Sequence, residues 1–416
     1  MTIIIILLNY FFFLGSSDII IKSEKQVLFD DIIKDKKIES IKDFSLIYLN
    51  NPPSIYIYTI IYNKSKNKSK LVIESIFDKN KYIYSLPNEI YVSNTFQYGS
   101  TLYIFSTKLY SIDLKSFELD TINLSRNQYK VINIQEFDNK KILVASYNEG
   151  VDIYSYPQLI LLTNIKRNHE VQYDRPIVRN GILFYKTRNN VLAAYNLKNK
   201  HTVWYYDFGK SNVYWLGIKV GTYDNYINEY KINNNFLFVS AGVGNLIKLR
   251  IEDGKPIIKK EQFKGKENNA GLITNFEFYD INDDGIEDLI APAVDYNIYC
   301  LNGQTLDIIW EYDTGFENQM PVSLFDITGD RVPEIFAVND EMKLSIIDGK
   351  RGKLIEEVIV VEGVKNGSIQ SEVFLADVDG DSTLNVIVKG GRDRLKIYEI
   401  PNVKVKAFSV IYNPEL

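Results

Sequence analysis

The chain has 416 residues, and its 48 Lys and Arg against 53 Asp and Glu give a formal net charge of −5. Apolar residues make up 45% and charged residues 24%, a composition that excludes a largely disordered chain. The acidic balance argues against nucleic-acid binding driven by bulk positive charge. The single cysteine, Cys300, excludes an internal disulfide. With two histidines, His169 and His201, the sequence disfavours a histidine-rich catalytic metal site.

An apolar run covers residues 3–14 and is followed by small residues. It is shorter than the roughly 20 residues that a membrane-spanning helix needs. The pattern predicts a secretory signal peptide over residues 1–17, with a buried first strand or an uncleaved anchor as alternatives. No other stretch is long and apolar enough to span a bilayer. We therefore expect an extracytoplasmic protein, which is secreted, periplasmic or at the cell surface.

Residues 18–42 are expected to form a lead-in segment. Within it, the apolar positions of residues 26–42 follow a helical period only loosely. From residue 43 onward, short runs of Ile, Val, Tyr, Phe and Leu alternate with turns of Asn, Asp, Gly and Lys. This alternation predicts strands joined by turns.

One phrase recurs along residues 43–416: a strand that ends in a polar residue, a turn, and another strand. Its eight copies are 39 to 56 residues apart, as expected for propeller blades of about 40 to 50 residues. The copies are centred on Glu74, Asp113, Ser155, Asn196, Glu252, Asn302, Asp348 and Glu399. We expect an all-β fold: a single β-propeller of four-stranded antiparallel sheets with eight blades. Seven blades, or a hairpin-rich β-sandwich, are the alternatives.

A second phrase supports this period. The segment 203–209, which contains Trp204, matches the segment 309–315, which contains Trp310, at an offset of 106 residues. The offset corresponds to two blades of about 53 residues, with one blade between the two tryptophans.

Three acidic loops recur once per expected blade between residues 270 and 400. They share the pattern D-x-[D/N/T]-x-D-x-x-x-[D/E/N] and cover Asp280–Asp288, Asp326–Glu334 and Asp377–Asn385. Strand-like segments flank each loop, so each loop is expected to join the first and second strands of its blade. The twelfth position is never Glu, which excludes an EF-hand.

The loop spacing predicts cation binding. Oxygen ligands at positions 1, 3, 5 and 9, with the carbonyl of position 7, can surround one hard cation. Two carboxylates about 4 Å apart repel by roughly 4 kcal/mol at an effective dielectric near 20, and all-oxygen ligation favours Ca²⁺. We expect one to three structural Ca²⁺ sites; the alternative is an acidic turn capped by hydrogen bonds. The predicted ligands are Asp280, Asn282, Asp284, Ile286 and Asp288; Asp326, Thr328, Asp330, Val332 and Glu334; and Asp377, Asp379, Asp381 and Asn385.

These loops and their flanks resemble the FG-GAP/VCBS repeats of integrin-α-like propellers over about residues 270–400. The resemblance implies that Ca²⁺ occupies the loops and rigidifies the blades. The first loop matches at every position, whereas the second has Arg331 where Gly is expected. The third loop departs from the pattern at Ser382 and at Asn385. The phrase around Trp310 also resembles PQQ-like propeller repeats, over about residues 100–360.

The expected function is a binding or adhesion module that engages a protein or a glycan through propeller loops. The cation loops account for the clustered acidic residues, so we assign no catalytic residue and no organic cofactor. We also expect the protein to be a monomer. A polysaccharide lyase or glycosidase, or a cell-envelope assembly scaffold, remains an alternative. The aromatic residues of the longest inter-repeat segment are either core residues or a surface that stacks on sugars or grips a partner; they are Tyr214, Trp215, Tyr223, Tyr226 and Tyr230.

Overall fold

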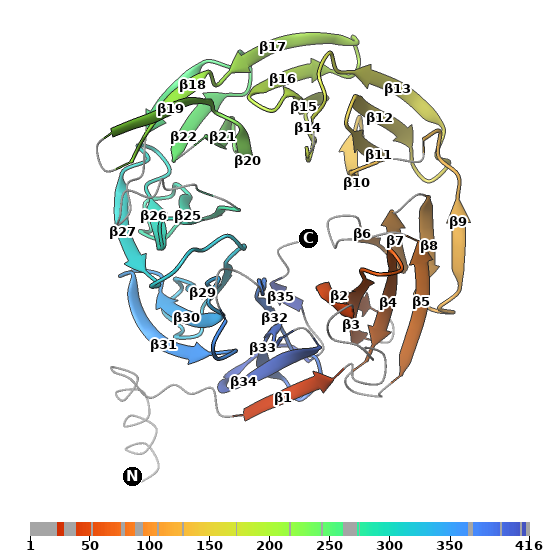
Figure 1. Cartoon of the computed structure of the whole chain (residues 1–416), viewed down its shortest axis with the longest axis vertical. Coiled ribbons are helices and arrows are strands. Elements are labelled where there is room, and N and C mark those ends of the chain that lie inside the picture. The colour runs from red at the N-terminus through yellow and green to blue at the C-terminus, as the bar shows by residue number, and fades with distance from the viewer. Residues whose placement is uncertain are drawn as a thin grey trace. The chain divides into compact units, whose positions relative to one another are not determined.

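In the computed structural model of the chain, every secondary-structure element assigned within the described residues is a β-strand. The fold is an eight-bladed β-propeller of mainly four-stranded antiparallel sheets, as the eight sequence copies predict (Figure 1). The described residues are 23–28, 39–50, 53–75, 80–87, 95–105, 108–126, 129–171, 173–215, 218–242, 244–260, 273, 275–364, 369–391, 393–407 and 410–412. The predicted signal peptide lies outside them.

The chain divides into two compact units, and the first contains residues 33–273. It holds five four-stranded sheets and one two-stranded sheet, each antiparallel with its strands in chain order. The first sheet contains β2(Glu39–Asn50), β3(Pro53–Asn63), β4(Lys68–Glu74) and β5(Lys81–Pro87). The second contains β6(Thr95–Tyr98), β7(Thr101–Phe105), β8(Leu109–Asp113) and β9(Leu119–Ile122). The third contains β10(Val131–Phe137), β11(Lys140–Tyr147), β12(Gly150–Ser155) and β13(Leu161–Lys166). The fourth contains β14(Ile177–Arg179), β15(Ile182–Arg188), β16(Val191–Asn196) and β17(His201–Asp207). The hairpin β18(Lys210–Trp215) and β19(Ile218–Asp224) precedes the fifth, β20(Ile227–Asn233), β21(Phe236–Ala241), β22(Asn245–Arg250) and β23(Pro256–Lys260).

The second unit contains residues 274–414 and 1–32, and it holds three sheets. Two are four-stranded: β24(Glu277–Tyr279), β25(Asp288–Pro292), β26(Asn297–Leu301) and β27(Ile308–Asp313), then β28(Ser323–Phe325), β29(Glu334–Val338), β30(Lys343–Asp348) and β31(Lys353–Ile359). The last has five strands in the order β1(Ser23–Leu28), β34(Arg394–Lys404), β33(Thr383–Lys389), β32(Phe374–Ala376) and β35(Val410–Tyr412).

Strand β1 completes this last sheet from the opposite end of the sequence. It pairs with β34 in antiparallel register from Ser23 opposite Glu399 to Leu28 opposite Arg394. The sequence placed residues 18–42 outside the propeller, but β1 lies within them and β2 begins at Glu39. Of the segment 26–42, which follows a helical period loosely, the structure describes residues 26–28 and 39–42, and these lie in strands. Pairing with a strand distant in sequence leaves no local signal there.

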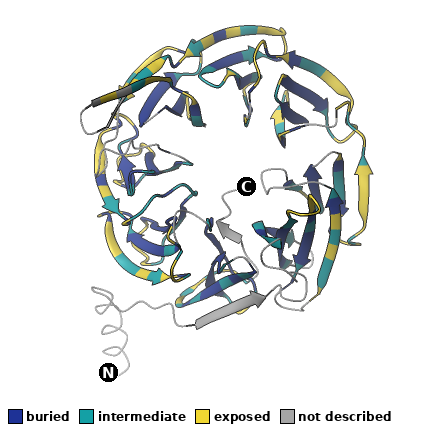
Figure 2. Cartoon of the chain, in the orientation of Figure 1, coloured by how far each residue is buried: buried dark blue, intermediate teal, exposed yellow. Residues whose placement is uncertain are grey.

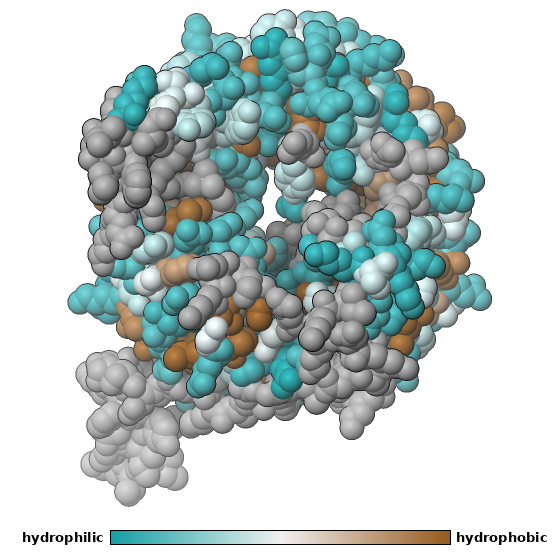
Figure 3. Space-filling model, in the orientation of Figure 1, coloured by the Kyte–Doolittle hydropathy of each residue, from teal (hydrophilic) through white to brown (hydrophobic). Residues whose placement is uncertain are grey.

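The inner strands carry long runs of buried residues, because consecutive sheets within a unit pack face to face. Every residue of β25, β29 and β33 is buried, whereas β13 and β31 keep most side chains at least partly exposed (Figure 2). This explains why segments such as residues 289–294 are continuously apolar rather than alternating. Hydrophilic residues cover much of the face in Figure 3, with apolar groups interspersed.

Within each unit, the hydrophobic cores lie between consecutive sheets. One core joins β29 and β30 to β33 and β34, with Phe336, Leu344 and Val386 fully buried. The other unit repeats this arrangement, for example with Leu192 and Leu237 in the core between its fourth and fifth sheets. Burial between sheets is therefore the main apolar contribution to stability.

The two tryptophans of the repeated phrase tie each outer strand to the next sheet. Trp310 in β27 donates its Nε1–H to the carbonyl oxygen of Gly349 at 2.7 Å. Trp204 in β17 donates in the same way to Ile251 at 2.9 Å. One four-stranded sheet, β20 to β23, lies in sequence between the sheets of β17 and β27, as the offset of 106 residues predicts, and the hairpin β18–β19 precedes it.

The longest inter-repeat segment contains the hairpin β18–β19. Tyr223 and Tyr226 are more than half exposed, whereas Tyr230 is buried in the core. The core interpretation is therefore confirmed for Tyr230, and Tyr223 and Tyr226 lie at the surface.

Candidate metal centre

Each of the three acidic loops joins the first two strands of its sheet, as predicted: β24 to β25, β28 to β29, and β32 to β33. The residue at loop position 9 pairs across the ladder with the residue that precedes position 1. These pairs are Asp288 with Tyr279, Glu334 with Phe325, and Asn385 with Ala376. The ladder thus fixes both ends of every loop.

A shared set of hydrogen bonds folds the three loops in the same way. The carboxylate at position 1 accepts from two backbone N–H groups later in the loop, as Asp377 does from Gly380 at 2.8 Å and Ser382 at 2.9 Å. The position 5 carboxylate accepts from the N–H of position 7, as Asp381 does from Thr383 at 2.7 Å. Such Asx-type bonds turn the backbone sharply and hold the oxygen ligands in place.

Loop position 6 takes a left-handed backbone conformation in every loop. Gly285 has φ of 81°, which a glycine adopts without strain. Arg331 and Ser382 occupy the same position with φ of 74° and 64°. The two departures from glycine therefore keep the loop conformation, at the energetic cost of a left-handed non-glycine residue.

The third loop brings three carboxylates to one point. One carboxylate oxygen from each of Asp377, Asp379 and Asp381 lies within 4.8 Å of the other two. Among the described residues, this is the one group of three His, Cys, Asp or Glu side chains that are close enough to share a metal ion. Asp377 is fully buried, Asp379 is intermediate and Asp381 is exposed. The site therefore opens from the interior toward solvent and could hold a metal ion.

The sequence ranks the loops differently. The first loop matches the pattern at every position, yet the grouped carboxylates are those of the third loop. At their predicted ligand positions, the first two loops also carry three acids each, at positions 1, 5 and 9, whereas the third loop has its acids at positions 1, 3 and 5. Position 3 is Asp379 in the third loop and the neutral Asn282 and Thr328 in the others.

Position 9 is buried in the first two loops, and burial changes its acidity. Asp288 and Glu334 are 0% and 2% exposed. Desolvation raises the pKa of Glu334 to about 7, and nearby Asp326 and Asp330 add to the rise. Desolvation also raises the pKa of Asp288. A buried carboxylate of this kind favours either a proton or a cation.

The donor set of the third loop fits calcium. Its ligand atoms are carboxylate oxygens, with the Asn385 amide oxygen accepting from the Val378 N–H at 3.0 Å. Hard cations such as Ca²⁺ prefer oxygen donors, whereas zinc and copper favour nitrogen and sulfur. Asp377, Asp379 and Asp381 would hold the ion, and the bound charge would offset their mutual repulsion.

A buried ion pair in the other unit was missed by sequence reasoning. Arg167 donates to the Asp174 carboxylate, and both side chains are fully buried. Tyr230 donates its hydroxyl to the other oxygen of Asp174 at 2.6 Å. Arg167 also donates to the carbonyl oxygens of Lys186 and Gly150. The network joins β12, β15 and β20, which belong to three successive four-stranded sheets, and its role is structural. The sequence contains no local motif that would predict it.

The single cysteine and the two histidines lie in different surroundings. Cys300 is fully buried in β26, and burial raises the pKa of its thiol. His169 and His201 are exposed in separate segments. Within the described residues, no helix has the length and apolar character needed to cross a bilayer.

No protein-family model matches the chain, and no curated protein matches it. The crystal structure of the computationally designed Ika8 protein aligns with a TM-score of 0.53 and 10% identity, over 87% of this chain and 96% of that one. BamB from Moraxella catarrhalis aligns with a TM-score of 0.51 and 9% identity, over 77% of this chain and 86% of that one. Identities this low show the fold alone: the chain is an eight-bladed β-propeller similar to a designed propeller and to the PQQ-like propeller of BamB.

Proposed function

We propose that this protein is an exported binding module whose β-propeller is stabilised by Ca²⁺. The observation that carries the proposal is the convergence of Asp377, Asp379 and Asp381 in a loop whose backbone is already fixed. Three carboxylates at one partly buried point have a strong electrostatic reason to take up a divalent cation. The proposal extends to the FG-GAP-like pattern of all three loops, with the third loop as the strongest site.

The first two loops are proposed as weaker sites. Their position 9 acids already accept hydrogen bonds from backbone N–H groups, as Glu334 does from Ile327 at 2.8 Å. Thr328 adds a hydroxyl hydrogen bond to Glu334 at 3.2 Å. Ca²⁺ must compete with a proton on Glu334 near neutral pH, which lowers its apparent affinity there.

The surroundings of two buried acids support a binding role. Asp152 and Asp174, which are among the buried acids outside the cation loops, are each engaged by an arginine and a tyrosine, as in the pair of Asp152 with Arg126 at 3.0 Å. Acids tied in this way hold sheets together and do not form a spare acid–base pair for glycoside chemistry. Rigid sheets with variable connecting segments are a common basis for binding sites.

Calcium titration of the purified full chain tests the metal part. We expect calorimetric Ca²⁺ binding that Asp381→Asn weakens at least tenfold, because one of three grouped charges is lost. The matched control is Asp120→Asn, whose exposed carboxylate accepts from the Thr121 N–H at 2.7 Å and from no other donor in the part of the chain that the structure describes. Equal affinity in the wild type and in Asp381→Asn would reject the third loop as the site.

The binding part needs a separate test. Immobilised protein is presented with panels of purified extracellular proteins and of oligosaccharides, with Ca²⁺ or with EGTA. Saturable binding to one class supports the module, and turnover of an oligosaccharide substrate would favour the enzyme alternative instead. Fractionation of the producing cells tests export, since retention in the cytoplasm contradicts it.

A further inference from the structure

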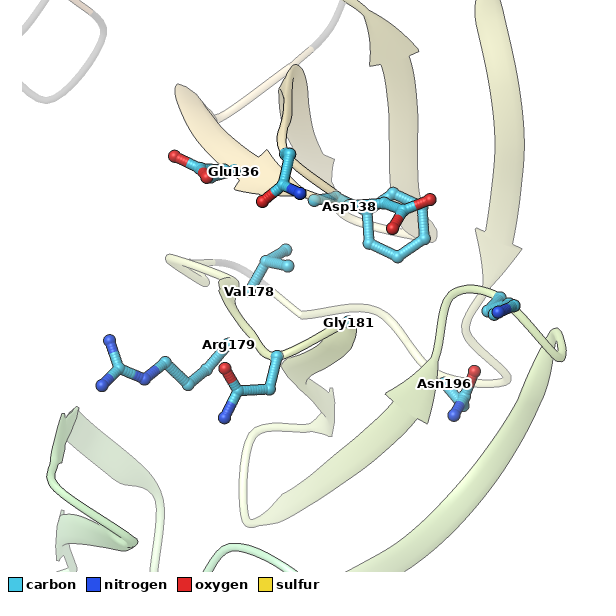
Figure 4. Close-up of a pocket in the computed structure, with 10 residues that line it drawn as sticks. Glu136, Asp138, Val178, Arg179, Gly181 and Asn196 are labelled. Atoms are coloured by element: carbon cyan, nitrogen blue, oxygen red, sulfur yellow. The ribbon is translucent and has the colours of Figure 1, made fainter.

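A polar groove lies in the first unit, between two adjacent sheets. Its walls are the β10–β11 turn and the β14–β15 turn, and the turn after β16 lies at one end (Figure 4). The volume is about 600 Å³, within the range of small-molecule sites. Glu136, Phe137, Asp138, Arg179, Gly181 and Lys198 are among its lining residues.

The groove is built from rigid parts. Asp138 and Asn139 both have positive φ, as do Asn180 and Gly181, which makes each wall a tight two-residue hairpin turn. Gln135 of β10 joins the walls, because its Nε2 donates to the Pro176 carbonyl at 2.6 Å and its Oε1 accepts from the Val178 N–H. A preformed groove loses little conformational entropy when it binds a ligand.

The lining presents both signs of charge and many amides. Glu136 and Arg179, one from each wall, extend toward the same side of the groove in Figure 4. Glu136 pairs with Lys141 at 3.1 Å, outside the lining. Asp138, Arg179 and Lys198 make no side-chain hydrogen bond or ion pair to the residues that the structure describes, and all three are exposed. Their donors and acceptors are available to a ligand.

An aromatic ring adds an apolar surface. Phe137 is half-buried, and an ideal Cβ on Gly181 would lie 3.4 Å from its Cε2 atom. Gly181 therefore lies against this ring, which lines the groove and also packs on a hydrophobic core. An aromatic ring beside amides and charges suits a ligand with apolar C–H faces and hydroxyl edges.

We infer that this groove binds a neutral glycan segment, an inference that rests on the proposed binding function and names its site and ligand class. Polyanions are disfavoured by Glu136 and Asp138, and polycations by Arg179 and Lys198. Sugar hydroxyls can both donate and accept, so they satisfy carboxylates, amides and cations together.

The test uses the full chain and an immobilised panel of neutral oligosaccharides, with sulfated and uronic acid oligosaccharides as further arms. We expect binding to one or more neutral members. The double variant R179A/K198A should weaken it about tenfold or more, the loss expected for removed hydrogen bonds from charged donors. F137L should weaken it too, because the ring is lost while apolar volume is kept.

The matched control is K64A/K66A, which removes two exposed lysines from the β3–β4 turn of another sheet. Binding that this control preserves and R179A/K198A loses supports the groove. Circular dichroism and the melting temperature of each variant report whether it folds. D138N is a further groove variant, which removes one charge and keeps a residue type suited to the turn.

The outcomes separate this inference from the proposed function. Glycan binding that survives R179A/K198A, F137L and D138N overturns the groove but leaves the binding module in place. A preference for sulfated or acidic glycans, or a protein ligand lost in R179A/K198A, overturns the neutral-glycan assignment. Absence of binding to every panel member at millimolar concentration overturns the inference, while protein binding would still support the module.

Discussion

The Oδ1 atom of Asp288 accepts a hydrogen bond of 3.0 Å from the backbone N–H of Gly303. This bond joins the end of the acidic loop to the Asn302-Gly303 turn, two motifs that the sequence showed separately. A Cβ on Gly303 would lie 1.9 Å from the carbonyl oxygen of Glu287. Gly349 sits in the same way in the next sheet, 2.0 Å from the carbonyl oxygen of Pro333. The repeated glycine is required because the turn touches the loop.

The first prediction concerns this contact. Gly303→Ala should lower the free energy of unfolding by about 1–3 kcal/mol, the range typical of an overpacked site, because the new methyl group overlaps backbone that cannot move aside cheaply. Thermal unfolding followed by circular dichroism measures it. Gly285→Asn is the control, since Gly285 has open space around it and Asn tolerates its φ of 81°. Equal stability of wild type and Gly303→Ala would refute the contact.

The second prediction concerns metal removal. EGTA should lower the melting temperature of the wild type, because it removes the stabilisation by bound Ca²⁺. A ligand that binds only the folded state stabilises it by roughly 2.7 kcal/mol when the ligand concentration is about 100 times its Kd. Asp381→Asn should lose most of this Ca²⁺-dependent shift, and Asp284→Asn should lose less of it, because the grouped carboxylates are those of the third loop. Identical melting curves with and without Ca²⁺ would contradict the prediction.

The third prediction is a pH dependence in EGTA. The pKa of Glu334 is raised to about 7 in the folded protein from an ordinary value of 4.5, so folding favours the protonated acid. Its stabilising contribution is complete below about pH 4.5 and is lost as the pH rises through 7. Urea unfolding across this window should show the loss in wild type and a smaller loss in Glu334→Gln. Parallel pH profiles of the two proteins would show that Glu334 does not titrate in this way.

The fourth prediction concerns the buried ion pair. Asp174→Leu should destabilise by about 3–5 kcal/mol, because it leaves the buried Arg167 guanidinium without its counter-charge. The double variant Arg167→Met/Asp174→Leu should recover part of that loss, since no buried charge remains. Tyr230→Phe, which removes the hydroxyl that donates to the Asp174 carboxylate, should cost about 1.5–3 kcal/mol. Chemical denaturation measures these variants together with Arg167→Met, and a loss in the double variant equal to the sum of the losses in its two single variants would argue against the pair.

Much of the fold was predictable because its signals are local. Polar strand ends such as Asn302 and Asp348 recur at the blade period, and each closes the third strand of its sheet. Burial on both faces makes inner strands continuously apolar, which the sequence shows directly. Strand β1 was not predictable, because its place beside β34 depends on pairing with residues at the far end of the chain.

The candidate sites show the same difference between features that depend on nearby residues and features that depend on distant ones. The sequence by itself determined the blade period, the position of the acidic loops between first and second strands, and the oxygen chemistry of their side chains, because each depends on residues close together along the chain. Only the tertiary structure decided which loop groups its carboxylates, which turns form the groove of Phe137 and Arg179, and which acid Arg167 neutralises. Those relationships join segments whose approach is fixed by the packing of sheets, and packing leaves no spacing pattern in the sequence.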